Sequence, residues 1–184
     1  MKNTPALLLI SVFSLFFASG CGISTSEVTS NGVNHFPTVT GTNLHGQEVT
    51  FPKDLTKDKT LLLVAFQRWQ QELCDAWYAR ISKYTAENSN VAYYEVPTIS
   101  KMTSFSRWFI YKGMRGGITD SEMRRKVVTL HIDKEPFKKE LNITSEDTVH
   151  LYIVDKKGKL LKHFIGSFDD AKWQEAKAIM EDRK

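Results

Sequence analysis

The chain has 184 residues, which suits one globular domain with short additional segments. Hydrophobic residues make up 41% and charged residues 25%, values that are ordinary for a folded protein. The formal net charge of +4 is small and its charges are interspersed, so the composition argues against nucleic acid as a partner, although it would suit a negatively charged surface.

The first 20 residues have the pattern of an export signal. Lys2 supplies a positive charge, and residues 6–18 form an uncharged apolar run of 13 residues. A helix of that length is too short to span a hydrocarbon core of about 30 Å, but such a run after a positive charge is typical of a signal peptide. The sequence therefore predicts a signal peptide over residues 1–20.

Small residues stand directly before the first cysteine. The segment Ala18-Ser19-Gly20-Cys21 resembles the lipobox of bacterial lipoproteins, although Ala18 replaces the usual leucine. The resemblance implies that Cys21 carries the lipid, with palmitate among its acyl chains, and anchors the protein to a membrane of the bacterial cell envelope, outside the cytoplasm. Residues 21–35, rich in Ser, Thr, Asn and Gly, would then form a flexible tether. The alternatives are ordinary cleavage that leaves Cys21 as a plain thiol, and an uncleaved anchor helix.

Residues 36–184 alternate between the periodicities of strands and helices. Residues 60–66 and 149–154 are continuous apolar runs, as expected of strands that are buried on both faces. Residues 70–87 place apolar side chains on one helical stripe. The expected strands are an opening hairpin within 41–51, then 60–66, 90–96 closed by Pro97, 127–132, 149–154 and 159–165. The expected helices are 70–87, 102–114, 120–125, 136–141 and a final helix capped by Asp169.

This order of elements is that of the thioredoxin plan. The first strand, helix and strand predict parallel pairing, and a closing hairpin and helix complete the domain. The segment IVDKKGKL at 153–160 resembles the closing hairpin of thioredoxin-like proteins, and the opening from Phe36 resembles their peroxiredoxin branch. The resemblance covers about residues 36–181 and implies an α/β, thioredoxin-like fold with a central mixed sheet flanked by helices.

A narrower resemblance covers the central block of the domain. Its motifs are Glu95-Val96-Pro97, Met114-Arg115-Gly117-Ile118 and the turn formed by Val154, Asp155 and Gly158. They are similar to the family of the mitochondrial ATP synthase assembly factor, the "ten" protein that assists subunit 6 of the membrane sector. That resemblance implies a non-enzymatic assembly or chaperone role with a membrane-protein subunit as partner. The N-terminus indicates a bacterial export route instead, so the organelle role does not carry over intact.

Thioredoxin-like redox enzymes carry the motif WCxxC directly after the first core strand, where a helix N-terminus lowers the pKa of the attacking thiol. Here Trp69 matches the tryptophan, but Gln70 and Leu73 occupy the two cysteine positions. Val149 stands where the cis-proline of these enzymes would fall, and a cis bond before a residue other than proline is costly. The sequence therefore predicts that the protein does not exchange disulfides.

Cys74 is the one cysteine that remains if Cys21 is lipidated. It belongs to the apolar stripe of the helix at 70–87, where a free cysteine is commonly buried and structural. The stripe consists of Leu73, Cys74, Trp77, Tyr78 and Ile81. The alternative function is that of a thiol peroxidase or redox protein in which Arg68 or Arg80 helps Cys74 to ionise.

Two further features are candidates for binding. Around Trp108 and Phe109 the apolar residues cover more than one helix face, which suits either a helix packed across the sheet or an exposed groove for a membrane-protein segment. Arg115, Arg124, Arg125 and Lys126 form a basic cluster that is either a solvated surface or a contact for anionic lipid headgroups. The five histidines show no metal-ligand spacing, and we expect no metal and no cofactor.

Overall fold

The computed structural model describes residues 34–101 and 104–182, and it describes no side chains for residues 104–109. The predictions for the signal peptide over residues 1–20, for Cys21 and for most of the tether therefore lie outside the described residues. Within the described ranges, no helix combines the length and the apolar character that crossing a membrane requires.

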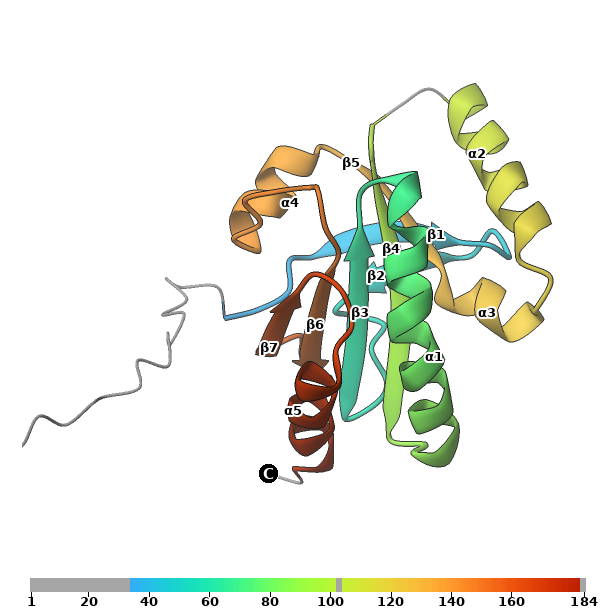
Figure 1. Ribbon diagram of the computed structural model, residues 1–184. Helices are drawn as coiled ribbons and strands as arrows, with labels where there is room; N and C mark the ends of the chain where they lie inside the picture. The colour runs from blue at the N-terminus through green and yellow to red at the C-terminus, as the bar shows by residue number, and fades with distance from the viewer. Residues whose placement is uncertain (1–33, 102–103, 183–184) are drawn as a thin grey trace, which may run out of the picture.

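A seven-stranded mixed sheet forms the centre of the domain (Figure 1). Its order is β2-β1-β5-β4-β3-β6-β7. Strands β3, β4 and β5 are parallel, and the pairs β1–β2, β1–β5, β3–β6 and β6–β7 are antiparallel. The strands are β1 (Val39–Asn43), β2 (Glu48–Phe51), β3 (Lys59–Ala65), β4 (Val91–Ser100), β5 (Val128–Ile132), β6 (His150–Asp155) and β7 (Leu160–Ile165).

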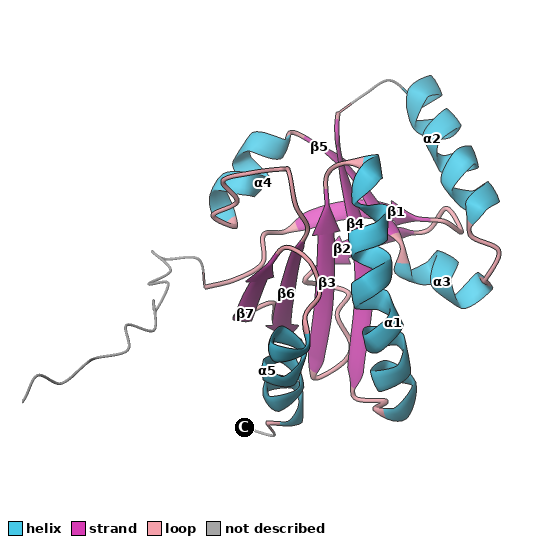
Figure 2. Cartoon of the chain, viewed as in Figure 1, coloured by secondary structure: helices cyan, strands magenta, loops and turns pink. Residues whose placement is uncertain are grey.

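Helices cover both faces of this sheet (Figure 2). The helices are α1 (Gln71–Glu87), preceded by a short 3-10 turn at Arg68–Gln70, α2 (Ser104–Gly117), α3 (Ser121–Lys126), α4 (Lys134–Glu140) and α5 (Asp170–Glu181). Helices α1 and α5 pack on one face, and α4 packs on the other. The predicted α/β fold with a central mixed sheet flanked by helices is confirmed.

Strand β3 joins the two hydrophobic cores. All of its residues are buried, because alternate side chains of a strand point to opposite faces and both faces are covered. Leu61 and Leu63 contact the core under α1 and α5. Leu62 and Val64 contact the core that contains Phe137 of α4. The continuous apolar run in the sequence reflects this double burial.

Strand β4 is longer than predicted, because Pro97 does not close it. Pro97 pairs with Ala65, the last residue of β3, so its missing N–H falls where that pairing ends. Strand β4 then continues by pairing with β5, with Thr98 opposite Leu130, and ends at Ser100. The partner that extends the strand lies about thirty residues away, and local sequence does not reveal it.

The ends of other elements differ by a few residues from the prediction. Asn34 and His35, assigned to the tether, already pair with the start of β7: the N–H of Leu160 donates to the carbonyl oxygen of Asn34 at 2.9 Å. Helix α4 begins at Lys134, because the Asp133 side chain caps it. The predicted cap of the final helix is confirmed, since the Asp169 carboxylate accepts the N–H of Lys172 at 2.8 Å.

Candidate functional site

A pocket of about 750 Å³ lies where β3 and β4 end. It is lined by the loop after β3, the first turns of α1, the last part of β4 and the middle of α2. These elements meet at one end of the sheet (Figure 1). In open α/β sheets, the carboxyl ends of parallel strands are the usual place for a ligand. It is also the place where the sequence puts Gln70 and Leu73 in the two cysteine positions.

Gln70 is fully buried and directly precedes Gln71, which lines this pocket. Its side-chain oxygen accepts the N–H groups of Phe66 and Gln67, with N···O distances of 2.8 and 3.1 Å. Its side-chain nitrogen donates to the carbonyl oxygen of Glu146 at 2.7 Å. Gln70 thus connects the end of β3 to the loop before β6. At a position where redox enzymes of this fold carry a nucleophilic cysteine, this residue has a structural role.

Two other residues that the sequence compares with thioredoxin landmarks are Trp69 and Val149. Trp69, at the tryptophan position, is exposed over 59% of its surface and follows Arg68, which lines the pocket. Val149 is fully buried in the core. In the described ranges the one cis peptide bond joins Phe51 and Pro52, so the bond before Val149 is trans.

Cys74 lies on the buried stripe of α1 and is 1% exposed. It packs in the core with Trp77 and Ile81, as the helical spacing indicates. Burial, and then the nearby carboxylates of Glu95 and Asp75, raise the pKa of the thiol far above its usual range. The reactive form of cysteine is the thiolate, so this environment disfavours nucleophilic chemistry at Cys74.

Alkylating reagents should therefore modify Cys74 slowly in the native protein. We expect iodoacetamide at pH 8 to modify Cys74 about a hundredfold more slowly in the folded chain than in urea, because only local opening exposes a thiolate. Peptide mass spectrometry separates Cys74 from Cys21. Ala79→Cys, on the exposed side of α1, supplies a matched control that should react at similar rates in both states. Equal rates for Cys74 in both states would show an accessible, ionisable thiol.

Glu95 is the most unusual residue of the pocket. It lies in the interior of β4, between Leu63 of β3 and Val127, and is only 5% exposed. Burial first, and then the nearby Asp75, raise the pKa of its carboxyl to about 7, while a hydrogen bond from the Gln71 side chain opposes the rise. Among the side chains that the structure describes, no cation forms an ion pair with Glu95.

Glu95 is not among the site residues predicted from the sequence, where it belongs only to the motif Glu95-Val96-Pro97. A signal was present. In β4, Val91 and Tyr93 are buried on the face that α1 covers, and Glu95 is the next residue on that face. A carboxylate at an inward position of a buried strand is a rare placement that marks either a paired charge or a functional site.

The predicted basic cluster is divided among three structural tasks. Arg115 donates to the Tyr111 hydroxyl at 2.8 Å and to the carbonyl oxygen of Leu44 at 3.3 Å, which holds α2 to the β1–β2 turn. Arg124 donates to the carbonyl oxygens of Ile118 and Arg115, at 2.6 and 3.0 Å, near the C-terminus of α2.

Arg125 is exposed and pairs with Glu122 at 2.7 Å. The three guanidinium groups therefore do not form one free surface, although Arg125 remains available to solvent. Trp108 and Phe109 belong to α2, and their side chains lie outside the described residues.

A buried histidine on β6, His150, pairs with a partly buried one on β7, His163. Nδ1 of His150 lies 3.0 Å from Nε2 of His163, and Nε2 of His150 lies 3.1 Å from the carbonyl oxygen of Ser145. Because a carbonyl only accepts, His150 carries its proton on Nε2 and accepts from His163 at Nδ1. Burial lowers the pKa of both rings, that of His163 to about 4. In the described part of the chain, no three potential metal ligands cluster.

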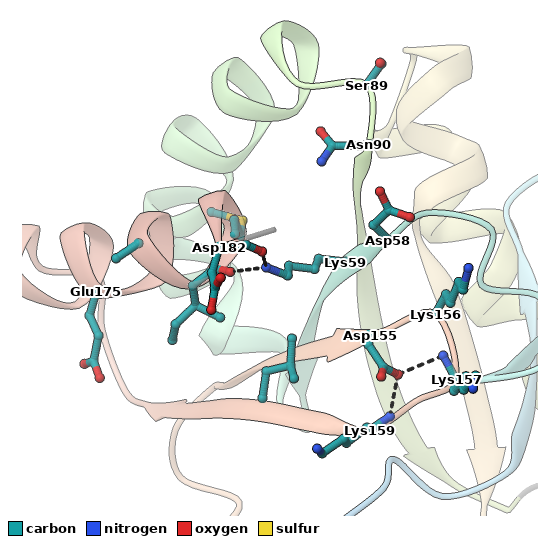
Figure 3. Close-up of a pocket in the computed structure, with 14 residues that line it drawn as sticks. Asp58, Lys59, Ser89, Asn90, Asp155, Lys156, Lys157, Lys159, Glu175 and Asp182 are labelled. Atoms are coloured by element: carbon teal, nitrogen blue, oxygen red, sulfur yellow. Dashed lines mark hydrogen bonds between the residues drawn. The ribbon is translucent and has the colours of Figure 1, made fainter. Parts of the chain in front are cut away.

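A larger pocket of about 1240 Å³ lies at the opposite end of β3 (Figure 3). There the Lys59 ammonium donates to the backbone carbonyl oxygens of Ile179 and Asp182, which holds the end of α5. The Asp155 carboxylate accepts the N–H groups of Lys157 and Lys159, at 2.8 and 2.9 Å, within the β6–β7 turn. These two charged groups are engaged in holding elements of the fold.

The sheet order, the crossover through α1 and the closing hairpin and helix define a thioredoxin-like fold. No protein-family model matches the chain, and no curated protein matches it. Among solved structures it is similar to the thioredoxin domain of a thiol-disulfide oxidoreductase from Bacteroides vulgatus, at 16% identity over 80% of this chain and 96% of that one, with a TM-score of 0.54. A putative electron transport protein from Aquifex aeolicus matches at 11% identity over 81% of this chain and 98% of that one, with a TM-score of 0.56. At these identities the likeness establishes the fold alone.

Proposed function

We propose that this protein is a lipid-anchored, thioredoxin-like binding protein that assists the assembly of a membrane complex without catalysing disulfide exchange. One observation carries the proposal: the redox position of the fold holds Gln70, buried and hydrogen-bonded on both ends of its amide, next to an open pocket. This position follows the first core strand, where thioredoxin-like redox enzymes carry the thiols that attack a disulfide, and here it holds no cysteine.

The pocket and its rim suit a polypeptide partner. Phe66, Pro97 and Met114 give it apolar walls, and Trp69, exposed and adjacent in sequence to a lining residue, offers a flat aromatic surface of the kind that anchors interfaces. Anchoring at Cys21 would hold the domain beside membrane proteins of the cell envelope, with a membrane-protein subunit as partner. The narrower resemblance to the assembly-factor family supports the same role.

A thiol peroxidase that uses Cys74 is the second candidate, because Cys74 also lines the pocket. Its thiol is 1% exposed and its pKa is raised, so the geometry favours the binding role.

Site-specific crosslinking tests the binding role. A photoreactive amino acid in place of Trp69 should capture one membrane-protein subunit in intact cells, because Trp69 is exposed and adjacent in sequence to a lining residue of the pocket. The same amino acid in place of Ile165, which is 55% exposed on β7, is the matched control and should not capture it. Identical products from both positions, or reduction of insulin disulfides by the purified protein, would overturn the proposal.

A further inference from the structure

We propose that the pocket binds one cationic side chain, a lysine or an arginine of the partner polypeptide, through the carboxylate of Glu95. This inference rests on the proposed binding function and names the chemistry by which the partner is recognised.

The position of Glu95 fits such a ligand. Strand β4 fixes the backbone of Glu95 between two neighbours in the sheet, so this buried residue is held in the lining of the pocket. Other lining residues are apolar and more exposed than Glu95, and they include Pro97, Ile110 and Met114. A lysine or arginine has a matching shape, because its methylene stem packs on apolar surface while its charged end reaches a polar group.

Among the side chains that the structure describes, none supplies a cation paired with Glu95. A buried carboxylate is costly unless a cation or several donors accompany it. A hydrogen bond from the Gln71 side chain favours the ionised carboxylate of Glu95, and the carboxylate of Asp75 repels it. Arg68 lines the pocket but is exposed and forms no ion pair with Glu95. An inserted cation would supply the missing partner, and the pKa of about 7 means that Glu95 can be ionised to receive it.

The ionisation of Glu95 also makes binding dependent on pH. A cation binds the ionised carboxylate, so affinity should be full above pH 8 and should fall as the pH drops below about 7. A ligand with the same stem but no charge should show no such dependence.

Peptide titration of the full-length protein in detergent micelles tests the inference. The probes are the acetylated, amidated peptides AAKAA and AARAA, the same peptide with norleucine at the central position, and butylammonium as a free amine. We expect the lysine or arginine peptide to bind the wild-type protein at pH 8 and to bind Glu95→Gln at least about tenfold more weakly, as loss of a charged hydrogen bond predicts. Glu72→Gln removes an exposed carboxylate from the same end of α1 and should bind like wild type.

Equal affinity of wild type and Glu95→Gln for the cationic peptides would overturn the inference, as would equal affinity of the norleucine peptide. Butylammonium that binds as tightly as the peptides would also overturn it, because the pocket would then take a free amine. If Glu95→Gln fails to fold, the pH dependence of the wild type decides: affinity that is unchanged between pH 8 and pH 5 would contradict a carboxylate contact.

The crosslink from the Trp69 position separates this inference from the proposed function. A crosslink that persists at full yield in Glu95→Gln cells would overturn the cationic contact and leave the binding function intact. Suppose that peptide binding depends on charge, but that the protein with the photoreactive residue at position 69 and an unchanged Glu95 gives no crosslink in cells. That result would overturn the binding function alone.

Discussion

Replacing Glu95 with glutamine is expected to stabilise the domain by about 3 kcal/mol at pH 8 and to leave it unchanged below pH 4.5. The carboxyl has its ordinary pKa of 4.5 in the unfolded chain and a pKa of about 7 in the folded one. Above pH 7 the folded protein therefore carries a buried charge, and glutamine has nearly the same shape without that charge.

The sign of the pH dependence follows from the raised pKa. A carboxyl with a raised folded pKa contributes full stability below its unfolded pKa, and that contribution is lost as the pH rises through the folded value. The difference in unfolding free energy between wild type and Glu95→Gln should therefore open between pH 4.5 and pH 7.

Urea unfolding of both proteins at pH 4, 6 and 8 measures this difference. His150 and His163 have lowered pKa values and act in the opposite direction, but both proteins contain them, so their contribution cancels. Glu72→Gln controls for the loss of a carboxylate at the surface. A destabilised Glu95→Gln variant at pH 8 would mean that the wild-type carboxylate is already well paired in the folded protein.

A group that lowers the stability of the folded state by this amount is unusual in a core. Binding residues accept such a cost, because the partner supplies the missing interaction only when it arrives. The stability measurement therefore examines the free protein, and the peptide titration examines the bound one.

Replacing Gln70 with leucine should destabilise the domain by about 3 kcal/mol. The change removes an acceptor for the N–H groups of Phe66 and Gln67 and a donor to the carbonyl oxygen of Glu146. Leucine is of similar size, so the main effect is the loss of three hydrogen bonds at a fully buried position. Partners that remain buried without a hydrogen bond each cost about 1 to 3 kcal/mol, and entry of water reduces that total.

Chemical unfolding at pH 7 measures the effect of Gln70→Leu. Gln174→Leu, at an exposed position of α5, is the matched control and should change stability by less than about 0.5 kcal/mol. Gln70→Glu keeps the acceptor and loses the donor to the carbonyl oxygen of Glu146, so it should be less stable than wild type. A loss of less than about 1 kcal/mol in Gln70→Leu, which is roughly the net contribution of one hydrogen bond, would show that the Gln70 amide does not hold the loop.

Much of the fold follows from local sequence. The apolar runs that form β3 and β6, the stripe on α1 that buries Cys74 and the Asp169 cap act through neighbouring residues, so each is visible in the chain itself. The predicted strand at 90–96 ends too early, because the extension of β4 past Pro97 depends on its pairing with β5. Arg115 and Arg124 donate hydrogen bonds to backbone carbonyl groups that come close to them only in the folded chain.

The sequence by itself determined the chemistry that is missing from the site. Gln70 and Leu73 stand at the two cysteine positions, and no folding can turn them into thiols. Only the tertiary structure decided what the site has gained. The pKa of Glu95 depends on how little water reaches it and on Asp75 and Gln71, which α1 brings to β4 from about twenty residues away. Residue identity is fixed in the chain, whereas burial and charge environment arise from neighbours that are distant in sequence.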